Sequence, residues 1–237
     1  MEMMPHRYDV PSVTVATAAP GLFGSLSLPN FETTHEADWR EGLPSLVTPL
    51  CTLRELELSD APSLLAHLTT EQVARFISPP PDTVEGFEDF IRWARLRRSQ
   101  GRYACFGIVP LGATHAVGMF QVRLSGYGEG TAEWGFVLGS AFWGTGIFVE
   151  GAAEVLTFLF EELGLERVEA RAVLQNGRAN GALRKVGAVR ETVLAGTFER
   201  NGQVMDQGLW VVTRDAWLRG HPDAALSDER CAVWLWS

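Results

Sequence analysis

Apolar residues recur at a helical period in the second half of the chain, directly after two closely spaced glycines. The segment from Phe142 to Gly164 opens with Gly144 and Gly146 and ends where a glycine C-cap belongs. Its apolar positions lie on one helical face: Val149, Ala152, Ala153, Leu156, Leu159, Phe160 and Leu163. The pattern predicts a glycine loop that leads into a buried helix.

Stretches of alternating apolar residues predict seven strands elsewhere. They cover residues 51–57, 103–109, 116–124, 131–138, 167–174, 189–194 and 204–212. The strands between 103 and 138 are joined by short glycine-containing turns, which is typical of an antiparallel meander. Asn201-Gly202, between the last two strands, is a strong signal for a two-residue hairpin loop. The pattern indicates a mixed α/β (α+β) fold.

Four further helices are predicted. One begins after Thr83, a favourable N-cap, and has an apolar face made of Phe87, Phe90, Ile91 and Ala94. The others lie at 59–67, 180–186 and 213–218. Together with the strands, they form the core of a domain that we place between residues 48 and 218, with an extension at 1–47 and a tail at 219–237.

Composition narrows the classes of protein and site. A length of 237 residues with 46% hydrophobic content suits one domain with a large core. Cys51, Cys105 and Cys231 are too few and too widely spaced for a disulfide framework, and the five histidines show no metal-ligand spacing. No apolar run reaches the ~18 residues of a membrane span, and no signal peptide is evident, so we expect a cytoplasmic protein without metal or membrane partner.

The glycine loop is the strongest candidate for chemistry, as an anion site. At a helix start the first four backbone N–H groups lack intrahelical partners and the macrodipole is positive, which suits a pyrophosphate. A Walker loop would need Gly-Lys-Ser/Thr here, and a Rossmann loop would need glycine in place of Val149. A tight turn into a core helix is the alternative. The net charge of −9 disfavours nucleic acid as the anion.

The surrounding order of segments resembles a known family. A strand at 131–139, the glycine loop, a second strand at 167–174 and the segment 175–188 resemble the GNAT superfamily of acetyl-CoA-dependent N-acetyltransferases, specifically its RimJ/RimL-type ribosomal-protein alanine acetyltransferase branch. The resemblance covers residues 48–218. It implies a mixed, mostly antiparallel sheet of about seven strands, with a splayed parallel pair at the centre and flanking helices.

The resemblance also implies which residues hold acetyl-CoA. Backbone groups of one strand would bind the pantetheine arm, the glycine loop would bind the pyrophosphate, and two asparagines would contact the arm. These residues are Phe136, Val137 and Leu138; Gly144, Thr145, Gly146, Ile147 and Phe148; and Asn176 and Asn180. Ala141 departs from the Gln or Arg that the superfamily usually has there, although Trp-Gly-x-Gly is typical of the branch.

Candidate catalytic residues follow from the needs of amine acetylation. A general base must reach the amine directly or through water. Glu133 lies three residues before Phe136 between apolar neighbours, and the branch commonly has Glu there, whereas a solvated strand carboxylate is the alternative interpretation. Asp206 matches an acid common in the branch and is the second candidate. Glu129, between glycines, is better interpreted as a turn residue.

The proton donor to the departing thiolate is missing from its expected positions. The branch has Ser where this chain has Ala179, and other GNATs have Tyr where this chain has Leu183. Either water supplies the proton, since a thiol pKa near ~8.5 makes thiolate a tolerable leaving group, or the protein binds acyl-CoA with poor turnover.

We therefore expect an N-acetyltransferase that uses acetyl-CoA and an amine acceptor, either a protein α-amino group or a small amine. A GNAT that uses a larger acyl group, a non-catalytic acyl-CoA-binding module and a CoA-independent binding domain are the alternatives. A homodimer stays open.

Overall fold

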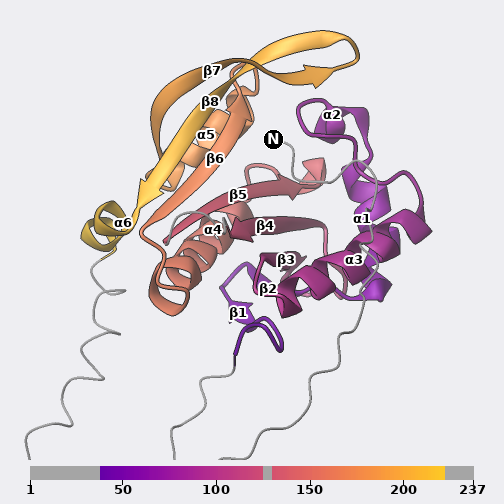
Figure 1. The fold of residues 1–237 in the computed structure, drawn as a ribbon. Coiled ribbons are helices and arrows are strands. Elements are labelled where there is room, and N and C mark those ends of the chain that lie inside the picture. The colour runs from indigo at the N-terminus through magenta and orange to yellow at the C-terminus, as the bar shows by residue number, and fades with distance from the viewer. Residues whose placement is uncertain (1–37, 125–129, 222–237) are drawn as a thin grey trace, which may run out of the picture.

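The computed structural model describes residues 38–124 and 130–221, which are built around one eight-stranded sheet (Figure 1). The strand order is β1-β2-β3-β4-β5-β6-β8-β7. The strands are β1 (Leu46–Val47), β2 (Cys51–Glu55), β3 (Tyr103–Pro110), β4 (Gly118–Leu124), β5 (Thr131–Leu138), β6 (Arg167–Val173), β7 (Val189–Arg200) and β8 (Gln203–Thr213). Among these described strands, only β5 and β6 pair in parallel. This confirms the predicted mixed, mostly antiparallel sheet with a parallel pair.

The predicted number of strands was too low by one. The additional strand, β1, has two residues and pairs Leu46 with Leu53 and Val47 with Thr52. Two residues cannot display an alternating pattern, so the sequence contained no signal for it. The hairpin prediction is confirmed, because Asn201 and Gly202 join β7 to β8 with φ values of 49° and 75°.

Helices cover both faces of the sheet. They are α1 (Ala61–Leu68), α2 (Glu71–Ala74), α3 (Val84–Ser99), α4 (Ile147–Thr157), α5 (Gly177–Lys185) and α6 (Arg214–Gly220), with 3₁₀ turns η1 (Leu58–Asp60) and η2 (Ser140–Phe142) and a π-helical segment η3 (Phe158–Glu162). The Thr83 hydroxyl accepts a hydrogen bond from the Gly86 N–H at 3.0 Å, which confirms the predicted cap of α3. The four-residue helix α2 was not predicted, because it is shorter than one period of a recognisable apolar stripe.

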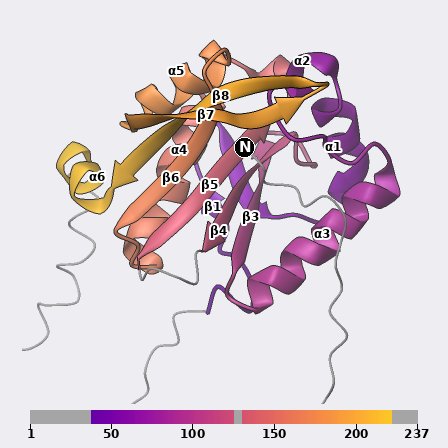
Figure 2. The ribbon, with the colours of Figure 1, turned by 45° about the horizontal axis from the view of Figure 1, so that its top comes forward.

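Two core clusters lie on opposite faces of the sheet. One cluster, behind α4 and α5, contains Trp134, Phe158 and Trp210. The other, beneath α1 and α3, contains Phe87 and Val137. Figures 1 and 2 show α3 and α4 on opposite sides of the strands. Strand β5 thus directs Trp134 to one layer and Val137 to the other, so both layers meet at this strand.

The described part of the predicted N-terminal extension packs on the domain. Trp39 and Leu43 contact the first core cluster, and the Arg98 guanidinium donates to the carbonyls of Trp39 and Arg40 while pairing with Glu55. Residues 1–37 and 222–237, and with them Cys231, Trp234 and Trp236, lie outside the described residues.

Both described cysteines are buried free thiols, as expected. Cys51 is 1% exposed and Cys105 is 3% exposed. Burial raises the pKa of both thiols, so neither is a ready nucleophile at neutral pH.

A buried carboxylate connects three segments beneath the second cluster. Asp60 is fully buried and accepts hydrogen bonds from the Arg54 guanidinium at 2.8 and 3.0 Å, from the Glu57 N–H at 2.8 Å and from the Ala116 N–H at 2.9 Å. Burial raises the pKa of Asp60, but these hydrogen bonds outweigh it and hold the pKa below its ordinary value. The carboxylate therefore joins β2, η1 and the segment just before β4.

We predict that Asp60→Asn lowers the free energy of unfolding by about 2–4 kcal/mol at pH 7, because Arg54 loses its partner in a mostly buried site. Since the folded-state pKa is depressed, the stabilisation is complete above the unfolded-state pKa of about 3.9 and is lost as pH falls through the folded-state pKa. Urea unfolding at pH 7 and at pH 3 measures this: the difference in unfolding free energy between the variant and the wild-type protein should be smaller at pH 3. Asp89→Asn, at an exposed ion pair with Arg92, should cost under about 0.5 kcal/mol. A loss that is equal at both pH values would contradict the assignment.

Candidate functional site

The parallel strands β5 and β6 separate soon after they meet. Their pairing comprises Thr131 with Arg167, Ala132 with Val168 and Glu133 with Glu169. Strand β5 continues to Leu138, while β6 stays paired with β8 through Val173. A gap therefore opens in the middle of the sheet.

Phe136 directs its backbone amide and carbonyl into this gap. The Gly139 N–H donates to the Val117 carbonyl at 2.9 Å, which fixes the odd-numbered residues of β5 as the ones bonded to β4. Successive residues of a strand direct their backbone groups to opposite sides, so Phe136 and Leu138 face β6. The Leu138 carbonyl accepts from the Trp143 indole N–H at 2.8 Å.

The glycine loop begins next to the end of β5. Gly144 and Gly146 have φ values of +78° and +94°, a conformation that glycine adopts without strain. Gly146 is the N-cap of α4 and has no side chain to accept from the helix, so the first amides of α4 are left to bind an external anion. The Thr145 hydroxyl donates to the Phe142 carbonyl at 2.8 Å and holds the turn.

A cleft of about 1070 Å³ passes through the gap. Its walls come from the end of β5, the glycine loop and the start of α4, from one face of α5, and from residues 70–77 around α2. The glycine loop and α5 belong to the first core layer, whereas Val73 of α2 belongs to the second. Trp143 packs against both clusters and so lies at the boundary. The cleft therefore connects the two faces of the sheet.

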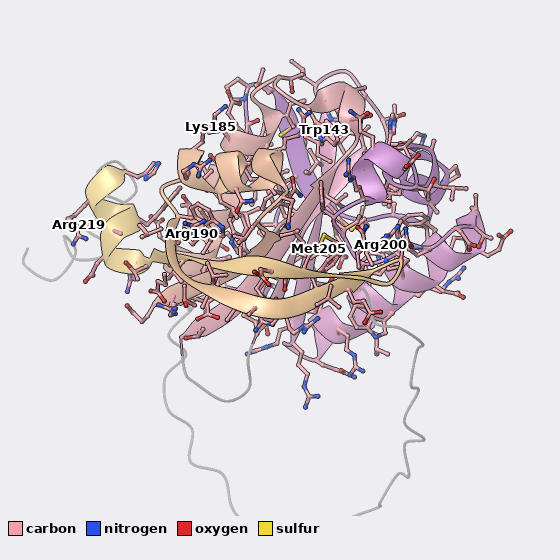
Figure 3. The ribbon with its side chains drawn as sticks, turned by 90° about the horizontal axis from the view of Figure 1, so that it is seen from above. Trp143, Lys185, Arg190, Arg200, Met205 and Arg219 are labelled. Atoms are coloured by element: carbon pink, nitrogen blue, oxygen red, sulfur yellow. The ribbon has the colours of Figure 1, made fainter. Side chains whose placement is uncertain are left out.

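The β7–β8 hairpin reaches across to the α2 end of the cleft (Figures 1 and 3). At its tip the Arg200 guanidinium donates to the Ile77 carbonyl at 2.9 Å, which joins residues far apart in the sequence. The register of β7 on β8 shifts between Leu194 and Phe198, and a bulge of this kind bends a strand. The bend directs the tip toward α2.

Most residues predicted to hold the cofactor line the cleft. They are Phe136, Val137, Leu138, Gly144, Gly146, Phe148 and Asn176. Thr145, Ile147 and Asn180 are not among the lining residues. Ile147 is 6% exposed and lies in the core, so only its backbone amide is placed to contact a ligand. Val137 lines the cleft with its side chain, because its backbone belongs to the ladder with Met119 on β4.

The two asparagines of α5 have different environments. Asn176 is the N-cap, and its side chain accepts from the Ala179 N–H at 3.0 Å. Asn180 is 5% exposed and its amide donates to the carbonyls of Val173 at 2.9 Å and Asn176 at 2.7 Å. Its oxygen accepts from the Trp210 indole N–H at 2.9 Å. The Asn180 side chain therefore holds α5 against the end of β6 and against Trp210 of β8.

Glu133 lies where β5 and β6 still pair, outside the lining of the cleft. Its side chain is 17% exposed, and one carboxylate oxygen lies 3.9 Å from the Arg171 guanidinium. Strand alternation puts Glu133 on the same face as Val137, the face that α2 covers. The Cα atoms of Glu133 and Phe136 are about 10 Å apart along the strand, at ~3.3 Å per residue.

Asp206 lies on the hairpin. It is exposed, and its carboxylate accepts from the Gly196 N–H at 2.9 Å, within the bent part of β7. Neither Asp206 nor Glu133 is therefore among the residues that line the cleft beside the glycine loop. Glu129 lies outside the described residues.

The cleft also contains charged and aromatic side chains that the sequence analysis did not identify. They are Glu71, Arg75, Trp143, Arg178 and Lys185. Those on α2 were missed because α2 itself was missed. For α5, the spacing of Arg178 and Lys185 on one helical face was available as a signal.

No group of three or more His, Cys, Asp or Glu side chains in residues 38–124 and 130–221 is arranged to hold a metal ion. Within the same residues, no helix is both long and apolar enough to cross a membrane.

Comparison with known families accounts for this arrangement. The family model described as "Acetyltransferase (GNAT) domain" matches residues 51–189, more than half of the chain. The chain belongs to the GNAT acetyltransferase family. The eight-stranded sheet and its separating parallel pair are this family's fold, and GNAT proteins transfer an acetyl group from acetyl-CoA.

Curated relatives carry the same activity in their names. The GNAT chain is 26% identical over 165 residues to the uncharacterized N-acetyltransferase p20 of Bacillus licheniformis. The aligned region covers 69% of this chain and 93% of the relative. It is 23% identical over 172 residues to the uncharacterized N-acetyltransferase YoaA of Bacillus subtilis, covering 72% of this chain and 97% of the relative.

Solved GNAT structures share the fold. The ribosomal-protein-S5-alanine acetyltransferase of Vibrio fischeri superposes with a TM-score of 0.66 at 19% identity, covering 73% of this chain and 98% of that one. RimJ of Mycobacterium smegmatis, in complex with CoA-disulfide, superposes with a TM-score of 0.63 at 22% identity, covering 74% and 94%. At these identities the likeness concerns the fold.

We predict that Asn180→Ala lowers the free energy of unfolding by about 2–3 kcal/mol, because it leaves the Trp210 N–H buried without a partner and removes the amide donor to the Val173 and Asn176 carbonyls. Thermal or urea unfolding measures the loss. The double variant with Trp210→Phe should lose less than the sum of the two single losses, since both remove the same hydrogen bond. Strictly additive losses would show that the two side chains are not coupled.

Proposed function

We propose that this GNAT protein transfers an acetyl group from acetyl-CoA to a primary amine, by direct attack of the amine on the thioester. The observation that supports the proposal most is the cleft that passes through the sheet at the β5–β6 gap. One substrate can enter beside the glycine loop and the other beside α2. Their reacting groups then meet where Phe136 offers an unpaired backbone edge.

The cofactor side follows from local geometry. The pyrophosphate would lie on the backbone amides from Gly144 to Phe148 at the start of α4, where the helix dipole favours an anion. The pantetheine arm would follow the free edge of β5, with the Phe136 N–H donating to the thioester oxygen. That hydrogen bond strengthens as the oxygen gains charge in the tetrahedral intermediate.

The end of the cleft that would hold the acyl group is lined by aromatic rings. The rings of Phe136 and Phe148 have centroids 4.5 Å apart, and Phe120 lies 5.7 Å from Phe148. Both Phe136 and Phe148 line the cleft. This packing supports acetyl over a larger acyl group.

The acceptor would enter from the α2 face, which is the face that Glu133 shares. At ~10 Å from Phe136 along the strand, Glu133 would take the amine proton through intervening water rather than by direct contact. The amine nitrogen forms a bond to the thioester carbon, and the carbon–sulfur bond then breaks. Water can protonate the thiolate, because a thiol pKa near ~8.5 makes thiolate a tolerable leaving group.

A protein α-amino group is the acceptor class that we favour, with a small amine as the alternative. The Trp143-Gly-x-Gly146 motif, which is typical of the RimJ/RimL branch, favours this class, and a cytoplasmic location is part of the proposal. Acetyl-CoA-dependent thiol release, measured across a panel of N-terminal peptides and small amines, tests the class.

A non-catalytic acyl-CoA-binding module is the second candidate. It is favoured by Ala179, which lines the cleft where the branch has a hydroxyl donor. Cofactor binding without thioester consumption by any amine in the panel would support this module and overturn the enzymatic proposal.

We predict that Gly146→Ala abolishes the cofactor-induced rise in melting temperature. An added Cβ at φ +94° is strained and lies 3.0 Å from Leu50, so the loop must change shape. Acetyl-CoA at 100-fold over its dissociation constant should stabilise the wild-type protein by about 2.7 kcal/mol.

Gly112→Ala is the matched control for this variant. Gly112 has a φ of +81° but lies in the β3–β4 turn with open space around it. Its variant should lose intrinsic stability through backbone strain and keep the full cofactor-induced shift. A Gly146→Ala protein that retains the shift would remove the glycine loop from the site.

We predict that Glu133→Gln lowers kcat by roughly 10²-fold with little change in the dissociation constant of acetyl-CoA, because an amide cannot accept the amine proton. Glu71→Gln, which changes a carboxylate in the cleft lining, should act mainly on the KM of the acceptor. The kcat of Glu133→Gln could instead stay within about twofold of the wild-type value while that of Glu71→Gln or Asp206→Asn falls. The general base would then be the carboxylate whose variant loses kcat.

A further inference from the structure

One face of α5 presents two cations to the cleft with small residues between them. Arg178 and Lys185 both line the cleft, and Gly181 and Ala182 between them line it as well. Seven residues correspond to about two helical turns, so the two cations share a face and are about 10.5 Å apart along the axis. The small residues leave the helix surface between the cations flat.

Arg178 is held beside the glycine loop. Its guanidinium lies 4.1 Å from the ring centroid of Trp143, and Trp143 directly precedes Gly144. The indole N–H of Trp143 is in turn bonded to the Leu138 carbonyl. The stacked pair therefore has a fixed position at the point where the loop would hold a pyrophosphate.

Lys185 is the single lysine of the chain, and the other residues among its 20 lysines and arginines are all arginines. It is exposed at the last turn of α5 (Figure 3). No carboxylate of the described residues forms an ion pair with Lys185 or with Arg178. Arg75 is a third cation of the cleft lining and Glu71 is its one carboxylate among the described residues, so the cleft has a local excess of positive charge on a chain of net charge −9 and is attractive to a polyanion.

We propose that Lys185 binds the 3′-phosphate of CoA while Arg178 supports its pyrophosphate, with the ribose and adenine over Gly181 and Ala182. The assignment deepens the proposed function and rests on CoA binding at the glycine loop. A compact ammonium on a flexible stem suits a terminal phosphomonoester, whereas a stacked guanidinium suits a phosphate held at a fixed position. The site is thereby selective for CoA over 3′-dephospho-CoA.

Titration calorimetry with CoA and 3′-dephospho-CoA tests the assignment. The wild-type protein should bind CoA roughly 5- to 20-fold more tightly, a range that allows for an exposed charged contact. Lys185→Met should weaken the binding of CoA alone and so bring the two dissociation constants to within about twofold of each other. Arg178→Gln should weaken both ligands by a similar factor and keep the preference.

Arg184→Gln is the control for general charge loss on α5. Arg184 is the adjacent residue on the helix, but its guanidinium lies over Trp210 at 5.7 Å and does not line the cleft. This variant should keep wild-type affinity and preference. Raising the salt concentration should reduce the wild-type preference for CoA, and should change that of Lys185→Met much less.

Amine labelling gives a second readout that does not depend on a variant. An amine-reactive ester, followed by peptide mass spectrometry, reports Lys185 separately from the chain's α-amino group. Saturating CoA should slow the modification of Lys185 more than saturating 3′-dephospho-CoA does.

Equal affinity of the wild-type protein for both ligands would overturn the assignment and leave the proposed function intact. The assignment would also be overturned if Lys185→Met reduced the affinity for both ligands by the same factor. Failure of the wild-type protein to bind either ligand would instead overturn the proposed CoA site itself, and the inference with it.

Discussion

The short parallel pairing of β5 and β6 is the constraint on which the rest of the structure depends. Only three residue pairs join the strands, after which β6 keeps β8 as its sole partner and β5 keeps β4. A continuous sheet would separate the two core layers completely. Because the pairing stops at Glu133, the cleft connects the layers, and residues from α2 and α5 can line one space.

The same gap gives the proposed anion site a position where few charged side chains are needed near the loop. Gly144 and Gly146 turn the chain so that α4 begins at the gap, and in the proposed site backbone amides rather than side chains would face the ligand. The charged side chains are placed one helix away, on α5. In the proposed site, the start of α4 would therefore fix where the anion lies, and the cations of α5 would attract it. Trp143 contacts both parts, because its indole N–H donates to the Leu138 carbonyl and its ring packs against the Arg178 guanidinium.

Features encoded locally could be predicted from the sequence, and features that depend on distant partners could not. Thr83, the Asn201-Gly202 turn and the glycine loop each shape the chain within a few residues, so the local conformations that they adopt could be predicted. Strand β1 and helix α2 were too short for any periodic signal. The internal bonds of Asn180 depend on Trp210, thirty positions later, so its burial could not be anticipated from the segment around it.

The two positions of α5 where related proteins have a proton donor, Ala179 and Leu183, lie on different faces of the helix. Asn180 and Leu183 face the core, and Leu183 is fully buried, whereas Arg178, Ala179 and Ala182 face the cleft. A hydroxyl in place of Leu183 would thus enter an apolar core in this chain, where an unpaired polar group is costly. The leucine is explained by packing. Of the two expected donor positions, only Ala179 lines the cleft, so the question of how the thiolate gains its proton concerns that position.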